Sequence, residues 1–149
     1  MLLYSCLCNK ILTMLSTHWR FYIALHFSLF CSRLLQFFRE AWSRFPLQRI
    51  RLLKLLDRSK CSRVIFLTGD RHVGGIYKFG KYHEVTSSSL THTVTYSTEA
   101  DSMRLFPLVH VNNVASVIFD WNSRRIAINL HSAEGREAGK ILQTYNVTM

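Results

Sequence analysis

Glycine and proline are scarce in this sequence of 149 residues. There are six glycines and two prolines, and the first glycine is Gly69. Residues 1–38 contain neither residue type, which favours helix over that stretch. Because 48% of the residues are hydrophobic and 13% are aromatic, the composition excludes a disordered chain. The length suits one domain with a sizeable core.

Acidic residues are few as well. Nine Asp and Glu stand against nineteen Lys and Arg, so the formal net charge is +10. The excess belongs to residues 1–63, which hold eleven of the basic residues and two of the acids. Aromatic residues do not alternate with Lys and Arg in the manner of RNA-binding strands. We therefore expect a solvated basic helix face and no nucleic-acid partner.

Several catalytic motifs are absent. The glycines do not form a phosphate-cradling loop of the P-loop or dinucleotide type, and there is no G-x-S-x-G nucleophile elbow. The cysteines match neither a zinc pattern nor a disulfide framework, so they do not fix the redox compartment. They are Cys6, Cys8, Cys31 and Cys61. These absences remove the sequence support for nucleotide-binding and serine-hydrolase functions.

The N-terminal part lacks a long hydrophobic run. Its apolar stretch, residues 21–32, lies between Arg20 and Arg33 and is shorter than the roughly 20 residues of a membrane-spanning helix. Two interpretations stay open for residues 11–38. They form a helix that is buried or lies on a membrane surface, or they are an anchor or uncleaved signal that leads to the membrane or the secretory route.

Hydrophobic patterning predicts one helix followed by strands. A helix is expected to start at Pro46 within residues 39–60, because proline is favoured in the first helical turn. Residues 74–80, which contain three glycines, are expected to be a loop. Four segments have the apolar runs or alternation of strands. They are residues 64–67, 82–96, the hairpin 114–121 with 124–131, and 140–146.

The stretch VIFLTGDRHVGGI, residues 64–76, combines a buried strand with polar side chains at its end. If the backbone stays extended, Asp70 and His72 point to the same side, at the strand end where α/β sheets bind ligands. Carboxylate and imidazole both ligate divalent metals, whereas the alternative is a turn-capping Asp70 and a polar loop His72. Arg71 between them would meet an anionic substrate or point to solvent.

These residues belong to a larger pattern that resembles a known family. Residues 42–46 contain Trp and Phe-Pro, residues 68–72 read Thr-Gly-Asp-Arg-His, and residues 84–92 read Glu-Val-Thr-Ser-Ser-Ser-Leu-Thr-His. In this order and spacing they resemble the C-terminal part of the PhoD-like metallophosphatases, of the calcineurin-like metallophosphoesterase superfamily. The resemblance covers about residues 40–131. Ser89 replaces the usual glycine, and Gly75 replaces an acid.

The resemblance implies a fold and a chemistry. The fold would be α/β, a partial αββα metallophosphoesterase sandwich representing its C-terminal portion. Asp70 and His72 would be metal ligands in a site for two divalent metal ions, whose identity stays open. Arg71 is the candidate substrate-binding residue from its position between them, and not from the resemblance. Such ions activate a water and neutralise charge on a phosphate ester, which makes a phosphate ester the implied substrate and hydrolase the implied class.

One departure from the family concerns the rest of the site. The family's upstream ligand motifs, of the forms Asp-x-His, Gly-Asp and Gly-Asn-His/Asp, have no counterpart in residues 1–60. We therefore expect residues 1–38 to be a hydrophobic, basic, helical leader and residues 39–149 to be the C-terminal part of a phosphatase domain. The chain would be a truncated, catalytically incomplete metal-dependent phosphoesterase. The alternative is a non-catalytic, membrane-associated protein that retains part of the fold, so whether it is an enzyme stays open.

Overall fold

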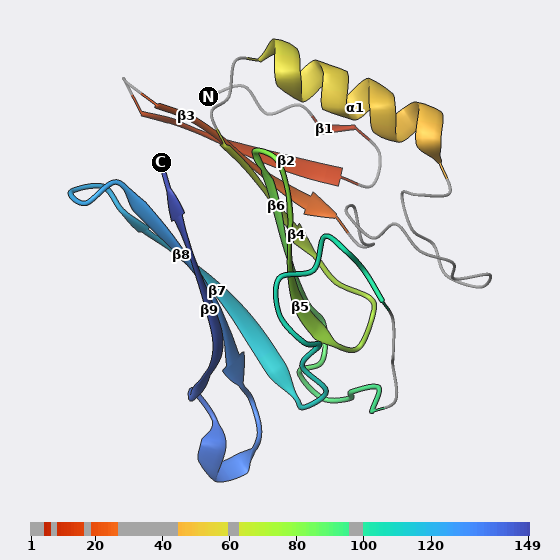
Figure 1. Ribbon diagram of the computed structural model, residues 1–149, viewed down its shortest axis with the longest axis vertical. Coiled ribbons are helices and arrows are strands. Elements are labelled where there is room, and N and C mark those ends of the chain that lie inside the picture. The colour runs from red at the N-terminus through yellow and green to blue at the C-terminus, as the bar shows by residue number, and fades with distance from the viewer. Residues whose placement is uncertain (1–4, 7–8, 17–18, 27–44, 60–62, 96–99) are drawn as a thin grey trace.

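The computed structural model describes residues 5–6, 9–16, 19–26, 45–59, 63–95 and 100–149. Over these residues the protein is an α/β structure with one α-helix and two sheets (Figure 1). The larger sheet has the order β1-β2-β3-β4-β6-β5, and the smaller one has the order β7-β8-β9.

The elements have the following bounds in chain order. The larger sheet contains β1 Ser5–Cys6, β2 Asn9–Ser16, β3 Trp19–His26, β4 Arg63–Thr68, β5 Gly74–Phe79 and β6 Tyr82–Ser87. The helix α1 spans Pro46–Arg58. The smaller sheet contains β7 Asn113–Asp120, β8 Arg125–Ser132 and β9 Ile141–Thr148, and a short 3-10 turn lies at Gly135–Glu137.

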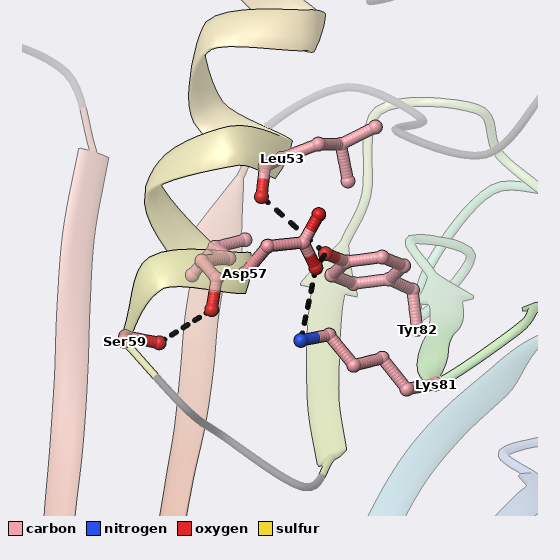
Figure 2. A network of polar contacts seen from close by, with 6 residues as sticks. Leu53, Asp57, Ser59, Lys81 and Tyr82 are labelled. Carbon is pink, nitrogen blue, oxygen red and sulfur yellow. Dashed lines mark hydrogen bonds and ion pairs between the residues drawn. The ribbon is translucent and has the colours of Figure 1, made fainter.

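The helix begins where the sequence predicts. Pro46 occupies its first turn, where a missing N–H costs no intrahelical hydrogen bond. Its buried residue Leu56 packs with Val64 and Phe66 of β4. At its C-terminal end Asp57 accepts a hydrogen bond from the Tyr82 hydroxyl at 2.5 Å and pairs with Lys81 at 2.9 Å (Figure 2). These contacts fasten the helix to the start of β6.

The strand β4 lies inside the larger sheet and confirms the predicted buried strand. It pairs in parallel with β3 on one side and with β6 on the other. Val64, Ile65 and Phe66 are all buried, as expected of a strand covered on both faces.

Alternate residues of β4 face different layers. Val64 and Phe66 pack against α1, whereas Ile65 packs against the smaller sheet. The second cluster joins both sheets and contains Ile65, Ile76, Val85, Ile126, Ile128, Leu130 and Val147. The layers therefore run helix, larger sheet, smaller sheet (Figure 1).

The expected hairpin and last strand are confirmed. The strands β7 and β8 pair in antiparallel fashion with Asp120 opposite Arg125, and β8 pairs with β9. Ile126, Ile128 and Leu130 are fully buried on one face, which matches their alternation with more polar residues.

The prediction that residues 1–38 form a helical leader is wrong for every one of these residues that the structure describes. Residues 5–6, 9–16 and 19–26 are strands, and β3 is hydrogen-bonded to β4. A lack of glycine and proline permits strand as readily as helix, and residues 19–26 contain Trp19, Phe21 and Tyr22, aromatic residues that favour strands. The pairing also supplies backbone partners along one edge of β4. Residues 27–38 lie outside the described residues.

Two further expectations need correction. The predicted loop at residues 74–80 is mostly the strand β5, which pairs with β6. The predicted strand 82–96 ends at Ser87 as β6. As for the membrane expectation on residues 11–38, no helix among the described residues has the length and apolar character to cross a membrane.

Candidate functional site

The candidate site lies at one edge of the larger sheet. Because β4 and β6 are parallel, their carboxyl ends meet there, at Thr68 and Ser87. The segment after β4 carries Asp70 and His72, and the segment after β6 carries His92. β3 is also parallel to β4, and its last residue, His26, is in register with Thr68. Ligands of open α/β sheets bind at such an edge.

The turn after β4 has an unusual backbone. Asp70 and His72 have φ angles of 69° and 56°, in the left-handed region that costs a residue other than glycine about 1–3 kcal/mol. The expectation of an extended backbone at these two residues is therefore wrong. Asp70 is exposed and His72 is half-buried. Their roles as metal ligands stay predictions.

The segment after β6 holds this turn in place. The hydroxyl oxygen of Ser88 accepts hydrogen bonds from the backbone N–H groups of Arg71 and His72, each at 2.9 Å. The carbonyl oxygen of His72 accepts hydrogen bonds from the N–H of Val94 at 2.7 Å and from the hydroxyl of Thr93 at 3.1 Å. These bonds offset the cost of the left-handed backbone, so the two segments form one unit.

The unit brings two imidazole rings together. The ring centroids of His72 and His92 lie 5.2 Å apart, and the rings are inclined at 77°. Two imidazoles bound to one tetrahedral ion at about 2.0–2.1 Å have ring centroids roughly 5 Å apart. The observed separation fits two ligands of a single ion, and it equally fits an ordinary edge-to-face contact between two rings. His92 is exposed, which leaves the pair open to solvent.

Further ligands are not gathered around this pair. Among the described residues, no three His, Cys, Asp or Glu side chains stand close enough together to hold an ion. Imidazole, as in His72 and His92, and carboxylate, as in Asp70, are donor types that zinc, iron and manganese accept.

Arg71 lies inside the protein. Its side chain is 5% exposed, and its Nη1 donates to the Tyr77 hydroxyl at 3.5 Å, a long hydrogen bond. Substrate binding by Arg71 stays a prediction. The observed contact ties the turn to β5.

A buried carboxylate lies below the turn. Glu84 of β6 is fully buried and accepts a hydrogen bond from the Thr68 hydroxyl of β4 at 2.8 Å. A buried carboxylate is costly without such partners. Glu84 thereby links the end of β4 to β6 just before both strands reach the site.

Reasoning from the sequence does not assign His92 or Ser88 to the site. Both stand in the motif of residues 84–92, so the signal is present in the resemblance. Spacing alone could not find them, because sixteen or more residues separate them from the residues they contact.

Comparisons with known proteins give one distant likeness. No protein-family model matches the chain, and no curated protein matches its sequence. Among solved structures the chain is similar to "GAP50 the anchor in the inner membrane complex of Plasmodium". The TM-score is 0.59 at 12% sequence identity, and the match covers 95% of this chain and 54% of that chain. The likeness shows the fold alone, and this chain spans about half the length of that structure.

Proposed function

We propose that the edge formed by Asp70, His72 and His92 is a divalent-metal site of the phosphoesterase type. The observation that carries the proposal is the contact of His72 with His92 at the carboxyl ends of two parallel strands. The order helix, sheet, sheet supports assignment of the fold to the C-terminal part of an αββα metallophosphoesterase sandwich. The PhoD-like motifs at residues 68–72 and 84–92 support the same assignment.

The residues of this chain have separate tasks in the proposed site. His72 and His92 would present ring nitrogens to the ion, and Asp70 would present a carboxylate. Ser88 holds the backbone of the turn so that the imidazole of His72 stays beside that of His92. A bound divalent ion would supply activation of a water and neutralisation of charge on a phosphate ester.

The chain by itself is expected to be catalytically incomplete. A two-metal site needs both ions fixed, and of Asp70, His72 and His92 only the two imidazoles lie in contact. The remaining donors would come from a second segment or a partner.

Metal binding is the first test. Purified protein is titrated with Zn²⁺ and Mn²⁺ by calorimetry, and the His72→Ala and His92→Ala proteins are compared with wild type. Each change should weaken binding by more than about tenfold, since even the loss of a partner behind a ligand costs roughly 10–100-fold. His131→Gln is the matched control, because His131 lies in β8 and bonds Ser116. Equal affinity in all four proteins would contradict the site.

Hydrolysis is the second test. An aryl phosphomonoester and a diester are supplied with manganese, calcium, iron and zinc in turn, and we expect negligible turnover. Turnover that disappears in both Asp70→Ala and His72→Ala proteins would show a complete site instead. Absence of both metal binding and turnover would favour the alternative, a non-catalytic protein. GAP50 is described as an anchor, and an anchoring role is then the function to examine in this chain.

A further inference from the structure

A concave site lies at the end of β4 and β6 that is opposite the candidate metal edge. A cavity of about 330 Å³ opens between the larger sheet and β9. Arg63 is the first residue of β4 and His83 the second of β6, so the cavity is a strand length away from the turn that carries Asp70. A volume near 300 Å³ is at the lower end for small-molecule sites.

The register of the strands explains why polar side chains gather there. Arg63 shares the face of β4 with Ile65, which packs toward the smaller sheet. His83 is in register with Ile65 on one side and with Lys78 on the other. Three neighbouring strands thus direct a guanidinium, an imidazole and an ammonium to the same face. The apolar core between the two sheets therefore ends at Arg63, Lys78 and His83.

The cavity is cationic. Arg63, Lys78 and Lys81 line it, and none of the described residues around it is acidic. The ammonium of Lys81 also pairs with Asp57 at 2.9 Å. On the β9 side Tyr145 contributes a ring, whose centroid lies 6.0 Å from the ammonium of Lys78 and 5.8 Å from the His83 ring centroid.

His83 has a buried ring nitrogen that lacks a partner. The residue is 2% exposed, and its Nδ1 has no hydrogen-bond partner in the described part of the chain. Burial, and then the charges of Lys78 and Arg63, lower the pKa of His83 to about 4, so the ring is neutral at pH 7. A neutral imidazole offers one N–H and one lone pair. A buried polar atom without a partner is costly. The ring lines the cavity, but its Nδ1 is closed to solvent, so a ligand would bond that atom only after a movement of the side chain.

We propose that this cavity binds a small phosphorylated molecule, with the phosphate group against Lys78 and Arg63 and with the His83 ring as part of the cavity wall. Phosphate is the anion that matches two or more cations, because it carries up to two negative charges and three acceptor oxygens, whereas a carboxylate carries one charge. The volume admits a phosphate together with a ring or short chain. The proposal does not depend on metal binding at the other edge.

The test is an NMR titration of the full chain with phenyl phosphate and with inorganic phosphate, in the presence of EDTA. Phenol, which has the ring without the phosphate, is the uncharged control probe. Both phosphates should shift the signals of the His83 ring and of the Lys78 and Tyr145 backbones, and phenol should not. Shifts confined to Asp70, His72 and His92 would overturn the proposal.

Variants distinguish phosphate binding in this cavity from non-specific electrostatic attraction of phosphate to a basic protein. Lys78→Gln should weaken phenyl phosphate binding by about tenfold, the usual effect of losing one charge-assisted hydrogen bond, and Lys78→Arg should retain it. Arg136→Gln removes the same charge from an exposed position outside the cavity and should leave the affinity unchanged. An equal loss in Arg136→Gln and Lys78→Gln would overturn the proposal. Loss of phosphate binding in Asp70→Asn would assign the phosphate to the metal edge and overturn it as well.

Discussion

A comparison of Thr68 with Thr86 can measure the contribution of one hydrogen bond, that from Thr68 to Glu84. The two threonines face each other in register across β4 and β6, and both are buried. The hydroxyl of Thr68 donates to Glu84 at 2.8 Å, whereas the hydroxyl of Thr86 has no hydrogen-bond partner among the described residues. Backbone, burial and residue type are shared, so the two positions differ mainly in this bond.

The threonine-to-valine changes should therefore have different effects. Thr68→Val removes a partner of a buried carboxylate and should lower the free energy of unfolding by about 1–3 kcal/mol. Thr86→Val removes a hydroxyl that gains nothing from burial and should leave stability unchanged or slightly raised. Urea unfolding of both proteins followed by circular dichroism measures the difference. Equal losses would mean that Glu84 does not depend on Thr68.

Asp57 should make stability depend on pH. The hydrogen bond from Tyr82, and then the contact with Lys81, hold the pKa of this carboxyl below its ordinary value of 3.8. A carboxyl whose pKa is lower in the folded state stabilises the fold above its unfolded pKa, and this contribution is lost as the pH falls through the folded value. The stability advantage of wild type over Asp57→Asn should therefore be larger at pH 6 than at pH 3.

The measurement is urea unfolding of both proteins at the two pH values. Lys81→Met removes the weaker partner of Asp57 and should reduce the pH dependence without abolishing it, because the Tyr82 bond persists. A difference between wild type and Asp57→Asn that is the same at pH 3 and pH 6 would show that these contacts do not hold the carboxyl in its charged form.

At the scale of elements, β5 is a strand whose glycines are explained by close packing, although in the sequence they predict a loop. Its first two residues, Gly74 and Gly75, are buried. A Cβ at Gly75 would stand 3.0 Å from the Tyr77 ring and 3.2 Å from Leu108. An acid at this position, as the resembled family has, would need these neighbours to move. The glycines that predicted a loop are therefore required by neighbours packed against a strand.

Gly74→Ala should destabilise this element. The new methyl would lie 2.9 Å from Oδ1 of Asn113 and 3.1 Å from Cβ of Val109, and overpacking of this kind costs about 1–3 kcal/mol. Gly69→Ala is the matched control, since its methyl would meet Ser88 at an ordinary 3.4 Å, and the change should stay within about 0.5 kcal/mol. Thermal unfolding compares the two. If Gly74→Ala left the stability unchanged, β7 and the segment before it would be able to move away from β5.

Prediction from sequence succeeded where local signals decide the element. Pro46 marks the start of α1, and the apolar run of residues 64–67 marks β4. It failed for β1 to β3, because lack of glycine and proline does not distinguish a helix from strands that find a partner in β4. At the candidate site, the roles of Asp70 and His72 stay predictions from their motif. His92 was missed, because only the parallel pairing of β4 and β6 brings the two segments together.

At the scale of the whole molecule, the seam between β3 and β4 determines how the N-terminal residues behave. β4 is an apolar strand whose edge is covered by β3. Without that partner, one row of its backbone N–H and C=O groups would face solvent beside a hydrophobic surface, which promotes association between chains. The seam and the membrane-anchor interpretation of residues 11–38 therefore predict opposite behaviour when the N-terminal strands are removed.

Deletion of residues 1–26 should make the protein associate rather than free it from a membrane. Size-exclusion chromatography with light scattering should show oligomers, and hydrogen exchange should become faster in residues 63–68 as the β4 edge loses its partner. Exchange in residues 125–132 provides the internal control, since β8 keeps β7 and β9 on its two sides. A monomeric product that moves from the membrane to the soluble fraction, with unchanged exchange in residues 63–68, would contradict the seam. That result would restore the membrane interpretation of the N-terminal residues.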